Sequence, residues 1–137
     1  MKAQIDLLTI WTDDTPRMAA FYRDALGFAI KLDMGGYVEF EHEGVRFAVC
    51  ARSVMVGMGF EGFGQGAQGQ TVELAFRCAT PDEVDREYAA LIAKGAAAVQ
   101  EPGDMPWGQR TAFFADPDGN VHELFADLPP AGDADAG

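Results

Sequence analysis

The cysteines and tryptophans of this sequence are the first residues to consider for chemistry. Cys50 and Cys78 each lie inside an apolar run (FAVCA and LAFRCA), which is typical of reduced core thiols and gives no reason to expect a disulfide. The two tryptophans, Trp11 and Trp107, offer flat rings that could stack on a planar ligand or meet a cation, although many tryptophans simply fill a core or an interface. The chemistry indicated by these residue types is therefore the binding of a flat or cationic molecule.

Size and charge limit the possible partners. The chain has 137 residues, 48% of them hydrophobic, which suits one compact domain or two small halves that share a core. With 10 basic and 22 acidic residues its net charge is −12, so phosphate backbones and anionic membranes would be repelled, and no nucleic-acid or membrane partner is predicted. The sequence has no apolar run of about 20 residues and no N-terminal signal peptide, so we predict a cytoplasmic protein.

The elements that would position these residues form one pattern, written twice. In the first copy the strand IDLLTIW is followed by a helix, with Thr15 as its cap, Pro16 in its first turn and Gly27 at its end. Three short strands follow, around FAIKL, YVEFE and VRFAVCA. In the second copy the strand VELAFRC precedes a helix with a Thr80–Glu83 capping box, and the strands AAAVQ, RTAFFA and VHELF follow it. The order β-α-β-β-β therefore occurs twice, and two such units are expected to pair.

These copies define the predicted domain organisation. One domain covers residues 1–128, with module 1 at about 4–52, a linker at 53–70 and module 2 at about 71–128, and residues 129–137 form a disordered tail. Residues 54–69 combine six glycines with two methionines and two phenylalanines. A flexible linker is one interpretation, but its apolar side chains favour a mobile flap or a segment that wraps a dimer partner.

Two motifs carry a family resemblance. FYRDALGF after the first strand, and WGQRTAFFADPDGNVHELFADLP near the end, resemble the vicinal oxygen chelate superfamily, which includes glyoxalase I, extradiol dioxygenases, and fosfomycin-, bleomycin- and mitomycin-resistance proteins. The resemblance covers about residues 3–128. It implies an α+β fold in which two βαβββ modules pair into curled mixed sheets around a U-shaped cavity, and it implies a homodimer.

The same resemblance identifies where metal ligands would stand. In metal-dependent relatives they occupy the positions of Leu7, Ala48, Glu73 and Glu123. Leucine and alanine cannot ligate, and two carboxylates alone would hold zinc or iron poorly, although Mg²⁺ or Mn²⁺ with waters is conceivable. No metal and no cofactor are therefore predicted, with Glu73 and Glu123 as weak metal candidates. The two histidines do not match these positions and are expected at the surface, His42 in a turn and His122 pointing away from Glu123.

Strand alternation suggests which side chains would face the predicted cavity. Glu73 and Glu123 lie opposite their apolar neighbours, and they could attract a cationic ligand or form salt bridges with Arg77 or Arg110. The predicted ligand-binding residues are Trp11, Tyr37, Glu39, Glu73, Trp107, Arg110, Phe114 and Glu123.

The sequence favours a metal-independent protein that sequesters an aromatic or cationic small molecule. The bleomycin- and mitomycin-binding resistance proteins resemble it most, because they too lack the metal ligands and are acidic. No catalytic residue is predicted, since no nucleophile or oxyanion hole is recognisable, and Asp116 and Asp118 are assigned to a turn. The alternatives are a divalent-metal lyase, isomerase or dioxygenase, and an accessory dimer that has lost both functions.

Overall fold

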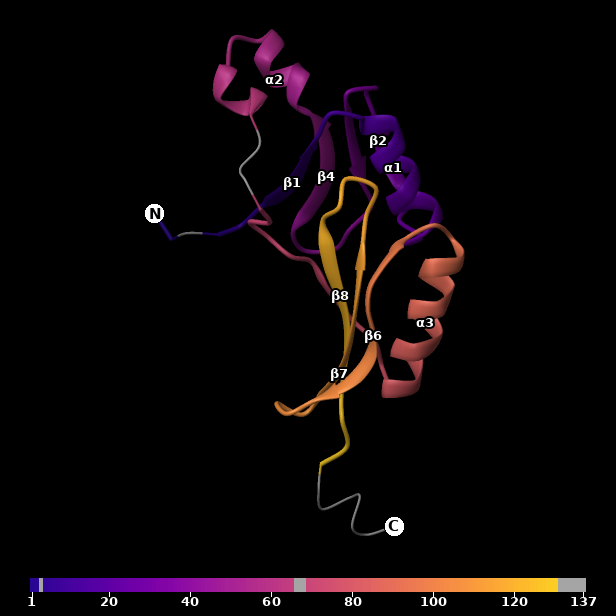
Figure 1. Ribbon diagram of the computed structural model, residues 1–137. Helices are drawn as coiled ribbons and strands as arrows, with labels where there is room; N and C mark the ends of the chain where they lie inside the picture. The colour runs from indigo at the N-terminus through magenta and orange to yellow at the C-terminus, as the bar shows by residue number, and fades with distance from the viewer. Residues whose placement is uncertain (3, 66–68, 131–137) are drawn as a thin grey trace. The chain divides into compact units, whose positions relative to one another are not determined.

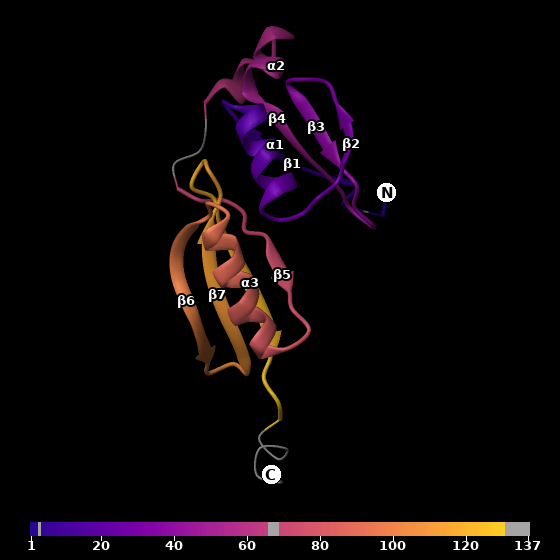
Figure 2. The same ribbon diagram turned by 90° about the vertical axis from the view of Figure 1, so that its right-hand side faces the viewer.

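The computed structural model describes residues 1–2, 4–65 and 69–130 (Figure 1). The chain divides into two compact units, unit 1 with residues 1–68 and unit 2 with residues 69–137. Each unit contains one four-stranded mixed sheet with a helix against one face (Figure 2). The predicted α+β class and the repeated βαβββ order are confirmed. Most of the predicted tail, residues 131–137, lies outside the described residues.

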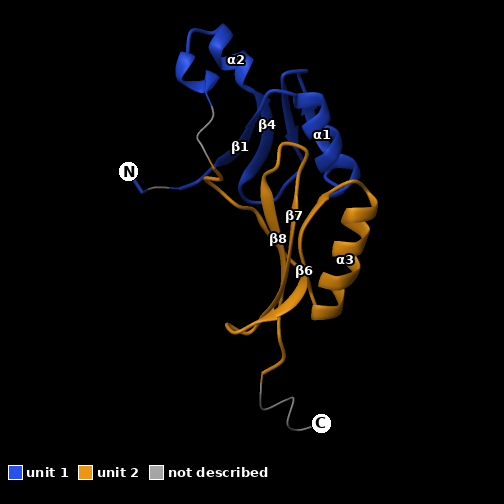
Figure 3. Ribbon diagram, viewed as in Figure 1, with its two compact units in different colours: residues 1–68 blue, residues 69–137 orange. Residues whose placement is uncertain are grey.

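Unit 1 (blue in Figure 3) follows the predicted element order. Its elements are β1 (Leu7–Thr12), α1 (Thr15–Asp24), β2 (Ile30–Asp33), β3 (Tyr37–Phe40) and β4 (Arg46–Ala51). The strand order is β1-β4-β3-β2, with β1 and β4 parallel and the other neighbours antiparallel. The core lies between α1 and the sheet, where the Tyr22 ring is 5.3 Å from that of Phe47 and 6.1 Å from that of Phe40.

The start of α1 differs from the prediction. The N-cap is Asp14, whose Oδ1 accepts a hydrogen bond from the Arg17 amide at 3.1 Å. Thr15 is already helical, and its hydroxyl donates to the Gly36 carbonyl oxygen at 3.1 Å. A carboxylate and a hydroxyl can both cap a helix. Here Asp14 is the cap, because the Thr15 hydroxyl is hydrogen-bonded to the turn between β2 and β3.

Residues 52–64 are folded. They form α2 (Arg52–Gly57) and the short 3-10 helix η1 (Glu61–Gly64). The Phe63 ring packs against Trp11 with their centroids 4.7 Å apart. This segment is therefore not an extended linker, whereas its predicted role as a flap or dimer-wrapping segment stays a prediction, and residues 66–68 lie outside the described residues.

Unit 2 (orange in Figure 3) repeats the order. Its elements are β5 (Ala75–Arg77), α3 (Pro81–Ala93), β6 (Ala97–Met105), β7 (Gln109–Ala115) and β8 (Val121–Asp127), in the strand order β5-β8-β7-β6. The predicted cap is confirmed, since the Glu83 amide donates to the Thr80 hydroxyl at 3.2 Å. Gly95 has a positive φ of 104°, which explains why glycine ends this helix.

Two strand boundaries in unit 2 differ from the prediction. β6 continues to Met105, beyond the predicted AAAVQ, while β5 is shorter than VELAFRC and begins only at Ala75. Glu73 therefore precedes the strand. None of the helices in the described part of the chain is long and apolar enough to cross a membrane.

Candidate functional site

The two faces of the unit 2 sheet differ in chemical character. In β8 the side chains of His122, Leu124 and Ala126 are buried, while the alternate residues Glu123 and Phe125 are partly exposed. The register pairs His122 with Phe114, Glu123 with Phe113 and Phe125 with Thr111. Because paired residues share a face, Thr111, Phe113, Glu123 and Phe125 lie on the face opposite α3, which we call the acidic face.

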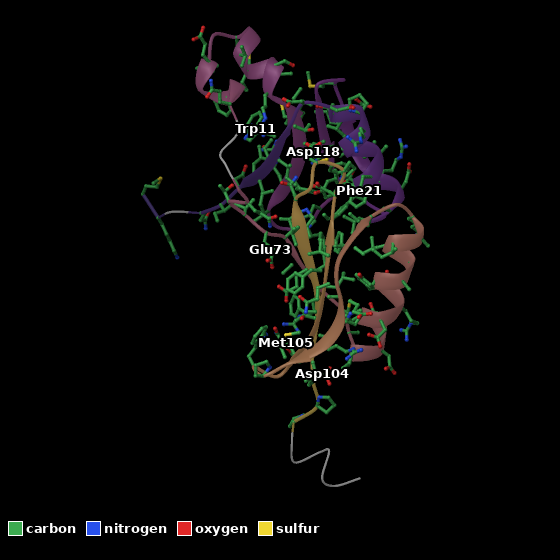
Figure 4. All side chains as sticks on the ribbon, viewed as in Figure 1. Trp11, Phe21, Glu73, Asp104, Met105 and Asp118 are labelled. Atoms are coloured by element: carbon green, nitrogen blue, oxygen red, sulfur yellow. The ribbon has the colours of Figure 1, made fainter. Side chains whose placement is uncertain are left out.

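Two carboxyl groups interact at one end of the acidic face. The pKa of Glu123 is raised from 4.5 to about 7. The main cause is burial, and smaller contributions come from a hydrogen bond with Glu73 and from the negative charge of Glu73. Glu73 is exposed and lies on the side of β8 away from α3 (Figure 4). The two carboxylates that the resemblance assigned to ligand positions therefore interact with each other.

The predicted alternative, a salt bridge from Arg77 or Arg110 to these glutamates, is wrong. Arg77 pairs with Asp127 at 3.0 Å, and Arg110 pairs with Asp85 of α3 and with Asp104 at 2.9 Å each. Within the described residues neither Glu73 nor Glu123 forms an ion pair, so the negative charge of the acidic pair is not compensated.

Arg110 and Phe114 do not share a face with Glu123, contrary to the prediction. Arg110 reaches Asp85 on α3, and Phe114 is fully buried at 0% exposure beside His122, with ring centroids 5.8 Å apart. Phe113 faces the acidic side instead. The sequence RTAFFA contains adjacent phenylalanines, and a shift of one residue in a strand exchanges its two faces.

The middle of the acidic face holds Arg77, which the sequence analysis named only as a possible salt-bridge partner, and Phe125 and Thr111, which it missed. The Arg77 guanidinium lies 4.7 Å from the centroid of the Phe125 ring. The hydroxyl of Thr111 is buried and has no hydrogen-bond partner among the described residues. An unsatisfied buried hydroxyl is destabilising. The register of β7 against β8 could have identified these residues, but it depends on pairing between distant segments.

Trp107 lies at the other end of unit 2, in the turn between β6 and β7. Its ring is 64% exposed, and its Nε1 donates to Gln109 Oε1 at 3.1 Å. Gln109 in turn donates to Asp127 at 3.3 Å. In the register of the sheet Gln109 lies opposite Asp127. Asp127 is four residues after Glu123 in β8, so the two residues are about 13 Å apart along the strand.

In unit 1 the predicted residues Trp11, Tyr37 and Glu39 lie on the face opposite α1. The register pairs Cys50 with both Trp11 and Tyr37, and it pairs Ala48 with Glu39. This arrangement agrees with the alternation expected from the sequence. Ring contact with Phe63 covers part of the Trp11 ring.

Glu39 is a buried carboxylate with internal partners. It accepts hydrogen bonds from Arg46 Nη2 at 2.8 Å and Nε at 3.1 Å, and from the Tyr37 hydroxyl at 2.7 Å. The hydrogen bonds from Arg46, and next that from Tyr37, lower the pKa of Glu39 from 4.5 to about 2. The pKa of Tyr37 is raised, chiefly by burial and next by its hydrogen bond to Glu39. Unit 1 therefore neutralises its carboxylate internally, and a role of Tyr37 and Glu39 in ligand binding stays a prediction.

His122 is buried, at 1% exposure, so its predicted surface position is wrong. Its Nδ1 accepts a hydrogen bond from the Leu74 amide at 3.2 Å, and its Nε2 lies 3.6 Å from Asp116 Oδ2. Asp116 also accepts from the amides of Asp118 and Asn120 at 3.0 and 2.9 Å, which confirms its structural role in the turn. The imidazole is buried because it links this turn to the segment that leads into β5.

The metal-ligand positions of the superfamily are incompletely filled. Ala48 is fully buried and Leu7 is partly exposed, and neither side chain can coordinate an ion. Across the described residues no three His, Cys, Asp or Glu side chains gather around a point that could hold one. The side chains present do not fit a three-ligand metal centre.

Comparison with known proteins identifies the family. The model of the Glyoxalase/Bleomycin resistance protein/Dioxygenase superfamily matches residues 4–124, and the chain belongs to this superfamily. A glyoxalase/bleomycin resistance protein/dioxygenase from Nocardioides is 30% identical, with a TM-score of 0.81 over 93% of this chain and 85% of that chain. No curated protein is significantly similar to the chain.

Two further structures show the same fold at lower identity. Lactoylglutathione lyase from Agrobacterium tumefaciens is 22% identical, with a TM-score of 0.72 over 92% of this chain and 95% of that chain. TioX from Micromonospora sp. ML1 is 18% identical, with a TM-score of 0.65 over 92% of this chain and 100% of that chain.

Proposed function

We propose that this protein binds and sequesters an aromatic or cationic small molecule on the acidic face of unit 2, without a metal and without chemistry. The observation that carries the proposal is the Glu73–Glu123 pair, whose carboxylates form no ion pair with any of the described residues. A bound cation would replace the repulsion between the carboxylates by attraction and would favour their ionised forms. Sequestration of this kind resembles that of the bleomycin- and mitomycin-binding resistance proteins.

The surroundings of the pair suit such a ligand. Phe113 pairs with Glu123 on the acidic face and is partly exposed, so it provides apolar surface beside the carboxylates. Trp107 could hold a second, flat part of an extended ligand. The net charge of −12 also favours a cation over an anion.

The alternative is a divalent-metal lyase, isomerase or dioxygenase. The observation that favours it is that two carboxylates stand at ligand positions of metal-dependent relatives, and oxygen ligands suit Mg²⁺ or Mn²⁺. Leu7 and Ala48 weigh against it. We expect the protein to purify without stoichiometric zinc, iron or nickel, and EDTA to leave its melting temperature unchanged. A tightly bound ion that is lost from the Glu123→Gln variant would establish the alternative.

Assembly and location are part of the proposal. We propose a homodimer, because Leu32, Met34, Met58 and Phe60 leave apolar surface of unit 1 exposed in the single chain. Cys50 and Cys78 are free buried thiols, which suits a reducing cytoplasm.

Fluorescence titration tests the proposal. Bleomycin, mitomycin and an anionic glutathione thioester would each be added to the protein, and the tightest binder would be repeated with Glu123→Gln and Trp107→Ala. Loss of a paired charge should weaken binding about 10- to 100-fold, and added salt should weaken it further. Glu101→Gln removes an exposed charge from β6 and should leave affinity unchanged. Tightest binding of the thioester, or full affinity in both variants, would contradict the proposal.

A further inference from the structure

We propose that Gln70 is a positioning residue of the acidic face: its side chain substitutes for a missing strand beside Val121 and thereby holds Glu73 against Glu123. The usefulness of this arrangement rests on the proposed function, because Glu73 is a binding group only if a ligand uses the acidic pair. The positioning itself can be tested without a ligand.

The first observation is how Gln70 meets β8. Its Oε1 accepts a hydrogen bond from the Val121 amide at 2.6 Å, and its Nε2 donates to the Val121 carbonyl oxygen at 2.6 Å. One side-chain amide thus satisfies both backbone groups of one strand residue, as the peptide group of a neighbouring strand would. Among the described residues β5 provides no backbone partner for Val121, because it begins only at Ala75, opposite Glu123.

The second observation is that the chain is fixed again just after Glu73. The Leu74 carbonyl oxygen accepts from the Glu123 amide at 2.9 Å, and the Leu74 amide donates to His122 Nδ1 at 3.2 Å. Gly69 precedes this segment with a positive φ of 77°, a conformation that favours glycine and lets the chain turn toward β8. Glu73 therefore lies on a short span of backbone anchored at both ends.

Anchoring is needed because the two carboxylates repel each other when both are ionised. Glu73 is exposed, so a free backbone would let its side chain move into solvent, away from the partly buried Glu123. The hydrogen bonds of Gln70 join segments that are 51 residues apart in sequence, and they hold the span in place without adding a charge to the site. Its neutral amide distinguishes Gln70 from a lysine or arginine, which would compensate the acidic pair.

A double-mutant cycle at pH 8 tests this role. Glu73→Gln removes the repulsion and should raise the melting temperature of the otherwise wild-type protein by about 2 to 4 °C. In a Gln70→Ala background the same change should have little effect, because Glu73 is already free to move away. Gln70→Met keeps the length of the side chain without its hydrogen bonds and should behave like the alanine variant. Gln4→Ala alters an exposed glutamine of unit 1 and should leave the gain intact.

A purely structural role would give a different result. Gln70→Ala would then lower the melting temperature, but Glu73→Gln would raise it equally in both backgrounds, and this outcome would overturn the proposal. Absence of any gain in the wild-type background would overturn it as well, since the carboxylates would then not interact. Bleomycin affinity should fall about as much in Gln70→Ala as in Glu73→Gln. If no probe binds the wild-type protein, the proposed function fails while the thermal cycle still decides the role of Gln70.

Discussion

Replacing Glu123 by glutamine should stabilise the protein at pH 8 and have little effect at pH 5. The pKa of this carboxyl is raised from 4.5 to about 7, chiefly by burial, so the folded state binds more protons than the unfolded state between these values. The contribution of Glu123 to stability is therefore expected to be highest below about pH 4.5, to fall as the pH rises toward 7, and then to level off. Glutamine cannot ionise and avoids this loss.

The raised pKa also sets the magnitude. A change from 4.5 to about 7 corresponds to at most about 3.5 kcal/mol at roughly 1.4 kcal/mol per tenfold change in proton affinity. Glu123 is only partly buried, and solvent screening reduces this to on the order of 1 to 2 kcal/mol. For a domain of this size, a gain of that order at pH 8 raises the melting temperature by several degrees.

Denaturant unfolding at pH 5 and pH 8 would measure the effect. The wild-type protein and the Glu123→Gln variant should differ in free energy of unfolding at pH 8 and converge at pH 5, while Glu101→Gln serves as the control for removing a glutamate from the unit 2 sheet. An equal difference at both pH values would refute the reasoning, because it would show that glutamine changes packing rather than ionisation.

Four further predictions concern unit 1 and assembly. Arg46→Ala should lower the melting temperature more than Arg23→Ala, since it leaves the buried Glu39 carboxylate without its main partner; equal losses would contradict this. The pKa of Glu39 is lowered to about 2, so the stability from this pair should be present above about pH 4.5 and lost as the pH falls toward 2 in acid titration. In a protein whose other tryptophan, Trp107, has been replaced, Phe63→Ala should shift the fluorescence emission of Trp11 to longer wavelength, because the Trp11 ring loses its contact with Phe63. An unchanged spectrum would mean that the two rings do not pack in solution. Light scattering at micromolar concentration should give about twice 14.7 kDa, whereas a monomer would exclude the proposed dimer.

The sequence by itself determined the repeated βαβββ order and the α+β class. These features depend on local chemistry: Thr80 caps α3 through residues next to it, Gly95 ends that helix, and branched apolar runs form strands. Alternation also placed Glu123 and His122 on opposite faces of β8, because β8 has a regular period of two. The acidic pair was found through the resemblance, since its two members lie 50 residues apart in the sequence.

Only the tertiary structure decided which partners these residues meet. From the sequence, Arg110 could pair with Glu73 or Glu123, or with a residue of α3. Its ion pair with Asp85 forms because α3 packs on the face of the sheet that carries Arg110. Phe113, and not Phe114, lies on the acidic face because the register of β7 against β8 pairs it with Glu123. A shift of one residue in this register would place Phe114 there instead. The contact of Gln70 with Val121 has no local signal, because a lone polar glutamine is typical of exposed surface. Each of these interactions joins segments distant in sequence, so its energy appears only when the fold brings both partners together.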